Sequence, residues 1–313
     1  LKQEQRDLER LLGNAEKWAA LLQSLGHPVD HEMLWRAWEP VLFNQAHDIA
    51  SGVMTDAVYE DTVTSYAFSR RLVTEQNDTS LQRLTGIVDT RGAGIPAIVW
   101  NTQSWPRTDA VSVEVGVMRP ATRGLRVLDG DGSSVPCQLE EAEWLEDGTL
   151  LRAKVAFVAR DVPALGHAVY HIECTDQPIE TPTVTEQVCG TLTTLENEHY
   201  RVTVDAGSGA LTSVWVRDGE WEALGGQANV IARQEDHGDF WEPYVPLDGA
   251  SRIAMTRQQP VPRVGQAVFS TDTRAEAASC TRGPVFSEVI VGHDLGEGTF
   301  RTRVRLYAGI ERI

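Results

Sequence analysis

The spacing of apolar residues changes near residue 90, and this change limits the folds open to the chain. Before it, apolar residues recur every three or four positions, as on one face of an amphipathic helix. After it they alternate with polar residues, as in Val111, Val113, Val115 and Val117. With 313 residues and 42% apolar content, the chain can bury two cores. We therefore expect an α+β protein, helical over 1–90 and β over 91–313.

Three helical segments precede residue 90. The first covers 1–25 and ends at Gly26-His27-Pro28, while Asp30 can cap the second. The second contains Pro40, which either kinks it or begins a new segment, and it stops at His47-Asp48. The third starts at Thr55 or Asp56, and short connections between such helices predict an antiparallel three-helix bundle. Its expected buried face comprises Val58, Tyr59, Val63, Tyr66, Ala67, Leu72 and Val73.

Many short strands follow, separated by Gly- and Asp-rich turns and by no helical pattern. Such a succession predicts a large antiparallel β-sandwich. The chain stops in a strand that enters a turn, so we expect the sandwich to be truncated. The expected strands are 97–101, 111–117, 124–128, 135–140, 149–158, 167–174, 199–205, 210–217, 228–233, 262–269, 285–292 and 299–308.

The charge and the hydropathy pattern exclude several classes of partner. The net charge of −17 would repel nucleic acid and anionic membranes. The sequence has no stretch of ~18 apolar residues that would cross a bilayer. The N-terminus resembles no signal peptide and has no initiator Met, so we expect a cytoplasmic protein of which this chain is a part. The sequence leaves open whether it forms a homo-oligomer.

His47-Asp48 is the first candidate for a functional site. A His at a helix end can bind a metal, and an adjacent Asp can bind metal, orient a substrate or cap the helix. The dipeptide alone does not decide between a metal site and a structural cap. The four cysteines form no C-x-x-C pair, so a thiolate zinc site is not expected.

The longer string around His47 resembles a known signature. Asn44-Gln45-Ala46-His47-Asp48-Ile49-Ala50-Ser51-Gly52, followed by the helix start at 56–61, is similar to a signature of the α-mannosidases of glycoside hydrolase family 38. Ala46 stands where that signature has an aromatic residue, and Ser51 where it has Pro. Three later stretches, at 98–107, 195–202 and 205–211, also resemble that family, in the same order.

The resemblance implies a three-part protein: an N-terminal α/β domain, a three-helix bundle and a large β domain. This chain resembles the second part and much of the third. His47 would be a zinc ligand, and Asp48 would contact the sugar or support the metal. The nucleophile, the acid/base carboxylate and the other ligands would belong to the missing N-terminal catalytic domain. The implied reaction is retaining hydrolysis of a mannose-containing oligosaccharide or glycoside, and this chain alone is expected to be inactive.

The loop from Glu235 to Tyr244 is the second candidate. It combines carboxylates with aromatic rings, which suits contact with a sugar, and Asp239 and Trp241 are the expected substrate-binding residues. The other interpretation is an acidic loop anchored by an aromatic residue in the core.

A rival from another class is a non-catalytic carbohydrate-binding or interaction protein made of the same two domains. A further alternative is a different α/β-barrel glycosidase that shares the β architecture. The string around His47 argues against the latter.

Overall fold

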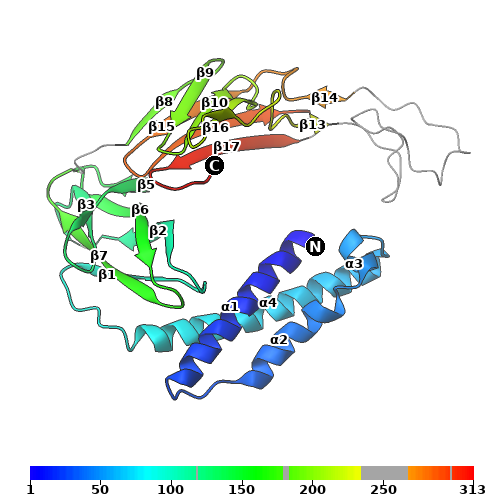
Figure 1. The fold of residues 1–313 in the computed structure, drawn as a ribbon, viewed down its shortest axis with the longest axis vertical. Helices are drawn as coiled ribbons and strands as arrows, with labels where there is room; N and C mark the ends of the chain where they lie inside the picture. The colour runs from blue at the N-terminus through cyan, green and yellow to red at the C-terminus, as the bar shows by residue number, and fades with distance from the viewer. Residues whose placement is uncertain (118, 179–182, 234–266, 297) are drawn as a thin grey trace, which may run out of the picture. The chain divides into compact units, whose positions relative to one another are not determined.

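The computed structural model describes residues 1–117, 119–178, 183–233, 267–296 and 298–313. Helices fill the first part of the chain and antiparallel sheets the described part after residue 90, which confirms the expected α+β fold (Figure 1). The contacts divide the chain into two compact units, Leu1–Thr90 and a second unit that begins at Arg91. None of the helices in the described ranges is long and apolar enough to span a membrane.

Three long helices and one short helix form the first unit, and the apolar faces of the three long helices meet in one core. Asp30 caps the second long helix, because its Oδ1 accepts from the backbone N–H of Met33 at 2.9 Å. Pro40 lies inside that helix, which continues to Phe43. The helices are α1 (Lys2–Ser24), α2 (His31–Phe43), α3 (His47–Ser51) and α4 (Asp56–Thr85). Their shared core contains Leu8, Leu12, Ala15, Ala19, Leu34, Ala37, Val41, Tyr66 and Val73.

The buried face of α4 differs from the apolar face expected from the sequence. Tyr66 and Val73 are buried, but Val58, Tyr59 and Val63 are exposed. Small or polar residues occupy much of the buried face instead, namely Thr62, Ser69, Gln76, Asn77 and Ser80. Two of them donate hydrogen bonds to neighbouring helices. Ser69 Oγ donates to the Ala37 carbonyl of α2, and Asn77 Nδ2 donates to the Leu11 carbonyl of α1. Hydrogen bonds thus add to the packing of Tyr66 and Val73 in holding α4 against α1 and α2.

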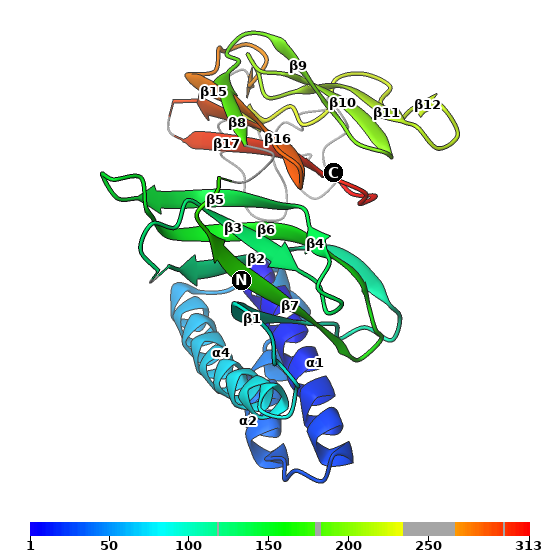
Figure 2. The same cartoon turned by 90° about the vertical axis from the view of Figure 1, so that its left-hand side faces the viewer.

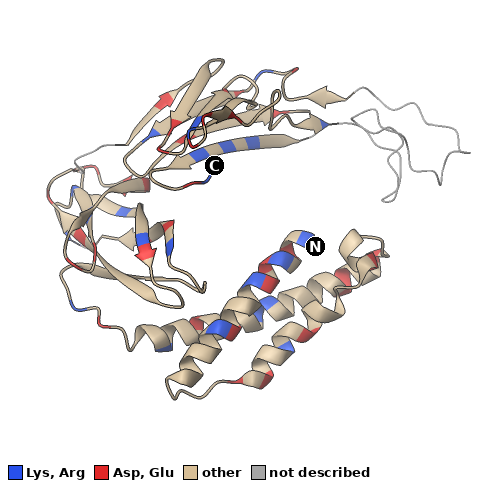
Figure 3. Cartoon of the chain, in the orientation of Figure 1, with Lys and Arg blue, Asp and Glu red and all other residues tan. Residues whose placement is uncertain are grey.

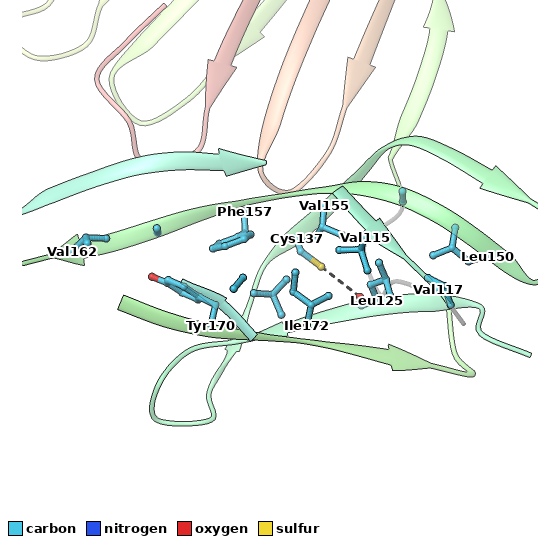
Figure 4. Packing of buried hydrophobic residues seen from close by; sticks show 14 residues of the cluster. Val115, Val117, Leu125, Cys137, Leu150, Val155, Phe157, Val162, Tyr170 and Ile172 are labelled. Atoms are coloured by element: carbon cyan, nitrogen blue, oxygen red, sulfur yellow. Dashed lines mark hydrogen bonds between the residues drawn. The ribbon is translucent and has the colours of Figure 1, made fainter. Parts of the chain in front are cut away.

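The first part of the β unit is a two-sheet module. One sheet has the order β1-β7-β3-β4 and the other β2-β6-β5, with antiparallel neighbours throughout. Side chains from both sheets fill the space between them, including Phe157 and Tyr170, whose rings lie 4.8 Å apart (Figure 4). The strands are β1 (Ile95–Trp100), β2 (Arg107–Gly116), β3 (Gly124–Leu128), β4 (Ser134–Val135), β5 (Cys137–Trp144), β6 (Leu150–Val162) and β7 (His167–Thr175).

A second two-sheet module follows (Figure 2). Its sheets have the orders β12-β11-β10-β9 and β17-β16-β15-β8, and a short pair joins β13 to β14. Its separate core includes Leu195, Val202, Val289 and Leu306. The strands are β8 (Val184–Gln187), β9 (Leu192–Glu196), β10 (Tyr200–Asp205), β11 (Leu211–Val216), β12 (Trp221–Glu222), β13 (Ala232–Arg233), β14 (Val268–Phe269), β15 (Ala277–Arg282), β16 (Phe286–Asp294) and β17 (Thr299–Tyr307). The β region is therefore built from two modules, each with its own core.

The two modules join through the outer face of β6. Ala156 and Val158 pack there against Val285, Phe286 and Ile310. The side chain of Gln138 crosses the junction, and its Oε1 accepts from the backbone N–H groups of Val285 and Phe286 at 3.2 and 3.1 Å. A Cβ added to Gly283 would overlap the Gln138 amide, so this close approach requires glycine.

Candidate functional site

His47 and Asp48 open the short helix α3 and point into solvent together. Their side chains are 91% and 59% exposed, and His47 Nε2 lies 3.3 Å from Asp48 Oδ1. The helix ends at Gly52, whose φ of 87° is left-handed, as at many helix C-termini. The backbone N–H of Gly52 donates to the carbonyls of Asp48 and Ile49. The turn therefore holds an imidazole and a carboxylate side by side at the surface.

The two residues before this turn anchor it to the bundle. Asn44 is buried, and its Nδ2 donates to the Pro40 carbonyl and to Ser65 Oγ of α4, both at 2.8 Å. Gln45 Nε2 donates to Glu9 Oε1 of α1 at 2.9 Å. The sequence pattern gave no role to these two amides. Their position two and three residues before His47 was the available signal. They fix the end of α2 to both other long helices.

An imidazole nitrogen and a carboxylate oxygen can each bind zinc, but a protein zinc site needs more than two such ligands. Within the described ranges, no group of three or more His, Cys, Asp or Glu side chains could hold a metal ion. His47 and Asp48 therefore do not form a zinc site by themselves, and the role of His47 as a zinc ligand remains a prediction. Asp239 and Trp241 lie outside the described residues, so their predicted contact with substrate remains a prediction.

Two of the later stretches that carried the resemblance contain an asparagine whose side chain supports a turn between strands. Asn101 Nδ2 donates to the carbonyls of Trp105, Val162 and Pro163, at 2.7 to 3.1 Å. Asn197 Nδ2 donates to the carbonyls of Tyr307 and Ile310, at 2.8 and 3.1 Å. Each side chain connects a turn to a segment far away in the sequence. These two side chains therefore hold the framework of the β unit together.

Two family models match the chain, one in its N-terminal part and one in its C-terminal part. The model described as the α-mannosidase middle domain matches residues 1–84, which hold His47 and Asp48. The model described as the glycosyl hydrolases family 38 C-terminal domain matches residues 195–313, which hold most of the second β module. The chain belongs to glycoside hydrolase family 38. It contains the middle and C-terminal domains of that family, with the first β module between the two matched ranges.

Solved structures show the same fold. A protein of glycosyl hydrolase family 38 from Enterococcus faecalis matches with a TM-score of 0.70 at 18% identity, covering 93% of this chain and 36% of that one. An α-mannosidase from Enterococcus faecalis matches with a TM-score of 0.66 at 17% identity, covering 91% of this chain and 33% of that one. The family 38 chain thus spans about a third of the length of these structures. None of the curated proteins compared with the chain matches it.

Proposed function

We propose that this chain is the middle and C-terminal part of a zinc-dependent, retaining α-mannosidase that removes terminal α-mannosyl residues from oligosaccharides or glycosides. The observation that carries the proposal is the exposed His47-Asp48 pair, held in place by Asn44 and Gln45. It lies within the range matched by the α-mannosidase middle domain. No side-chain hydrogen bond caps the start of α3, so neither side chain serves as its helix cap.

In this proposal His47 binds zinc through its imidazole, and Asp48 accepts a hydrogen bond from a sugar hydroxyl or completes the metal shell. Zinc, when bound, would act as a Lewis acid and as a template for the sugar hydroxyls. Asn44 and Gln45 hold the turn still, which keeps the two side chains in a fixed position relative to the sugar. The work of this chain is therefore to bind and orient.

The carboxylates that cleave the bond would come from a further domain of the same protein. Retaining glycosidases need a nucleophile and an acid/base residue about 5 Å apart, with a covalent glycosyl-enzyme between the two steps. The chain covers only about a third of the family structures it matches, which leaves room for such a domain. We therefore propose that residues 1–313 alone do not hydrolyse mannosides.

Hydrolysis of an aryl α-mannoside by the full-length protein tests this function. His47→Ala is expected to lower kcat/KM by at least about 100-fold, because loss of a direct ligand should exceed the 10–100-fold effect of losing a ligand's partner. His31→Ala, which removes an exposed imidazole at the start of α2, is the matched control and should leave kcat/KM within about twofold. Unchanged hydrolysis by the His47 variant would refute the role of His47.

A further inference from the structure

A pocket of about 550 Å³ opens in the bundle where α1 connects to α2. The connection is held to α4 by Arg83, whose Nη1 donates to the Pro28 carbonyl at 2.9 Å. Leu22 of α1 and the last turns of α4 complete the wall of the pocket. Pockets that bind small molecules usually measure roughly 300–1,000 Å³, so this one is large enough to hold a ligand.

Two polar side chains form the buried wall of this pocket. Gln76 and Ser80 are only 9% and 1% exposed, and both belong to the buried face of α4. Within the described residues, their only side-chain hydrogen bond is the one between them, from Gln76 Nε2 to Ser80 Oγ at 3.5 Å. A hydrogen bond of that length is weak, and a buried amide without good partners costs stability. A polar ligand in the pocket would supply the partners that the chain does not.

The rim of the pocket carries one charge of each sign. Asp30 Oδ1 accepts from the backbone N–H of Met33, and Arg83 Nη1 donates to the Pro28 carbonyl. Both side chains are exposed, and the second carboxylate oxygen and the other guanidinium N–H groups face no partner among the described residues. Figure 3 shows acidic and basic side chains interspersed along the helices of the bundle. The rim therefore favours a ligand without net charge.

We propose that this pocket binds a neutral sugar, whose hydroxyl groups bond to Gln76 and Ser80 while its C–H groups contact Leu22. A hydroxyl group both donates and accepts, so it can satisfy the oxygen and the nitrogen of the amide. An amino acid would also match the two charges of the rim. One of its charged ends would, however, be buried against the uncharged Gln76 and Ser80, which is costly. A neutral polyhydroxylated ligand avoids that cost.

The pocket and His47 lie at opposite ends of α2. Asp30 caps the start of this helix, whereas His47 follows its last residue, Phe43. A helix of 13 residues is about 20 Å long. A sugar in the pocket would therefore not contact His47, and the proposal goes beyond the proposed function and does not depend on it.

Hydrogen–deuterium exchange of the full-length protein, with and without mannose, tests the pocket. At a mannose concentration of about ten times its Kd, the backbone N–H groups of residues 76–83 should exchange about tenfold more slowly, because each local opening must first release the sugar. Gln76→Leu should lower the affinity at least about tenfold, because the hydrogen bonds to the amide are lost. Gln82→Leu makes the same change at an exposed position of α4, and this matched control should keep the protection.

Three results would overturn the proposal. Exchange that mannose does not change would show that water alone fills the pocket. Equal protection in wild type and Gln76→Leu would place the sugar elsewhere. Protection by glycine but not by mannose would identify an amino-acid site. Ser80→Ala, which adds no bulk, should weaken mannose binding severalfold, and circular dichroism of each variant shows whether the bundle remains helical.

Discussion

Asn101 and Asn197 use their amides in the same way, although they lie in different β modules. Each donates through Nδ2 to carbonyls of a distant segment and accepts through Oδ1 from backbone N–H groups of its own turn. A single asparagine therefore satisfies several buried backbone groups at once. Both residues belong to stretches by which the sequence resembles family 38. At those two stretches the resemblance reflects folding requirements rather than chemistry.

The variant Asn197→Ala tests whether this asparagine stabilises the fold. The change leaves the carbonyls of Tyr307 and Ile310 and the backbone N–H groups of His199 and Tyr200 without this partner. The expected loss is about 2 kcal/mol of unfolding free energy, the usual cost of unsatisfied buried groups. Urea unfolding measures it, with the exposed Gln227→Ala as control. A loss no larger than that of the control would contradict the account.

Glu198 adds a pH dependence to the same turn. The hydrogen bond from the backbone N–H of Gly309 is the largest cause that lowers the pKa of Glu198 below its ordinary 4.5. A lowered carboxyl pKa stabilises the fold above the unfolded value, and this stability is lost as pH falls through the folded pKa. Glu198→Gln should therefore weaken the fall of the melting temperature below about pH 5. An identical pH profile in wild type and variant would refute this.

At the scale of elements, the sequence predicted helices and strands better than it predicted their faces. The change of period near residue 90 located the boundary between helix and sheet. The expected face of α4 was wrong at Val58, Tyr59 and Val63, because apolar spacing cannot show that α1 starts too late to cover them. Strand β15, Ala277–Arg282, was not expected, because its small and polar residues lack an apolar alternation. Its pairing with β8 and β16 decides its conformation.

The junction between the β modules contains a partly buried cation, Arg305, whose side chain is 16% exposed. Arg305 binds Glu288 at 2.7 Å and Glu140 of the other module at 3.2 Å, and its guanidinium lies 3.7 Å from the centre of the Phe286 ring. Burial acts to lower the pKa of Arg305, but hydrogen bonds to Glu288, Tyr307 and Glu140 outweigh it and raise that pKa. Arg305 therefore stays charged and bonds both modules at once.

Arg305→Met should cost about 3 kcal/mol, because it leaves Glu288, whose side chain is only 6% exposed, without its closest cation. Arg303→Met is the matched control. Its guanidinium binds the same Glu288 at 3.1 Å but is 55% exposed, so its loss should cost less than about 1 kcal/mol. Denaturant unfolding followed by tryptophan fluorescence compares the two. Equal effects would show that the bridge across the junction adds no stability.

At the scale of the whole molecule, the sequence predicted an α+β fold and a resemblance to family 38. Both predictions are confirmed. It did not predict that the β region forms two modules, because that division depends on which distant strands pair, as β1 does with β7. For the site, the sequence placed His47 and Asp48 at the end of the second helix, but α2 ends at Phe43 and the pair opens the separate short helix α3. The anchors Asn44 and Gln45 were missed because their partners, Ser65 and Glu9, are on other helices.

The central claim is that His47 is one ligand of a zinc ion whose other ligands lie on a further domain. The most direct measurement is the zinc content of the full-length protein after dialysis, by mass spectrometry, with residues 1–313 measured beside it. The account predicts one zinc per full-length chain, its loss in His47→Ala but not in His31→Ala, and no tightly bound zinc on residues 1–313. Full zinc in the His47 variant, or tight one-to-one binding by residues 1–313 alone, would contradict it.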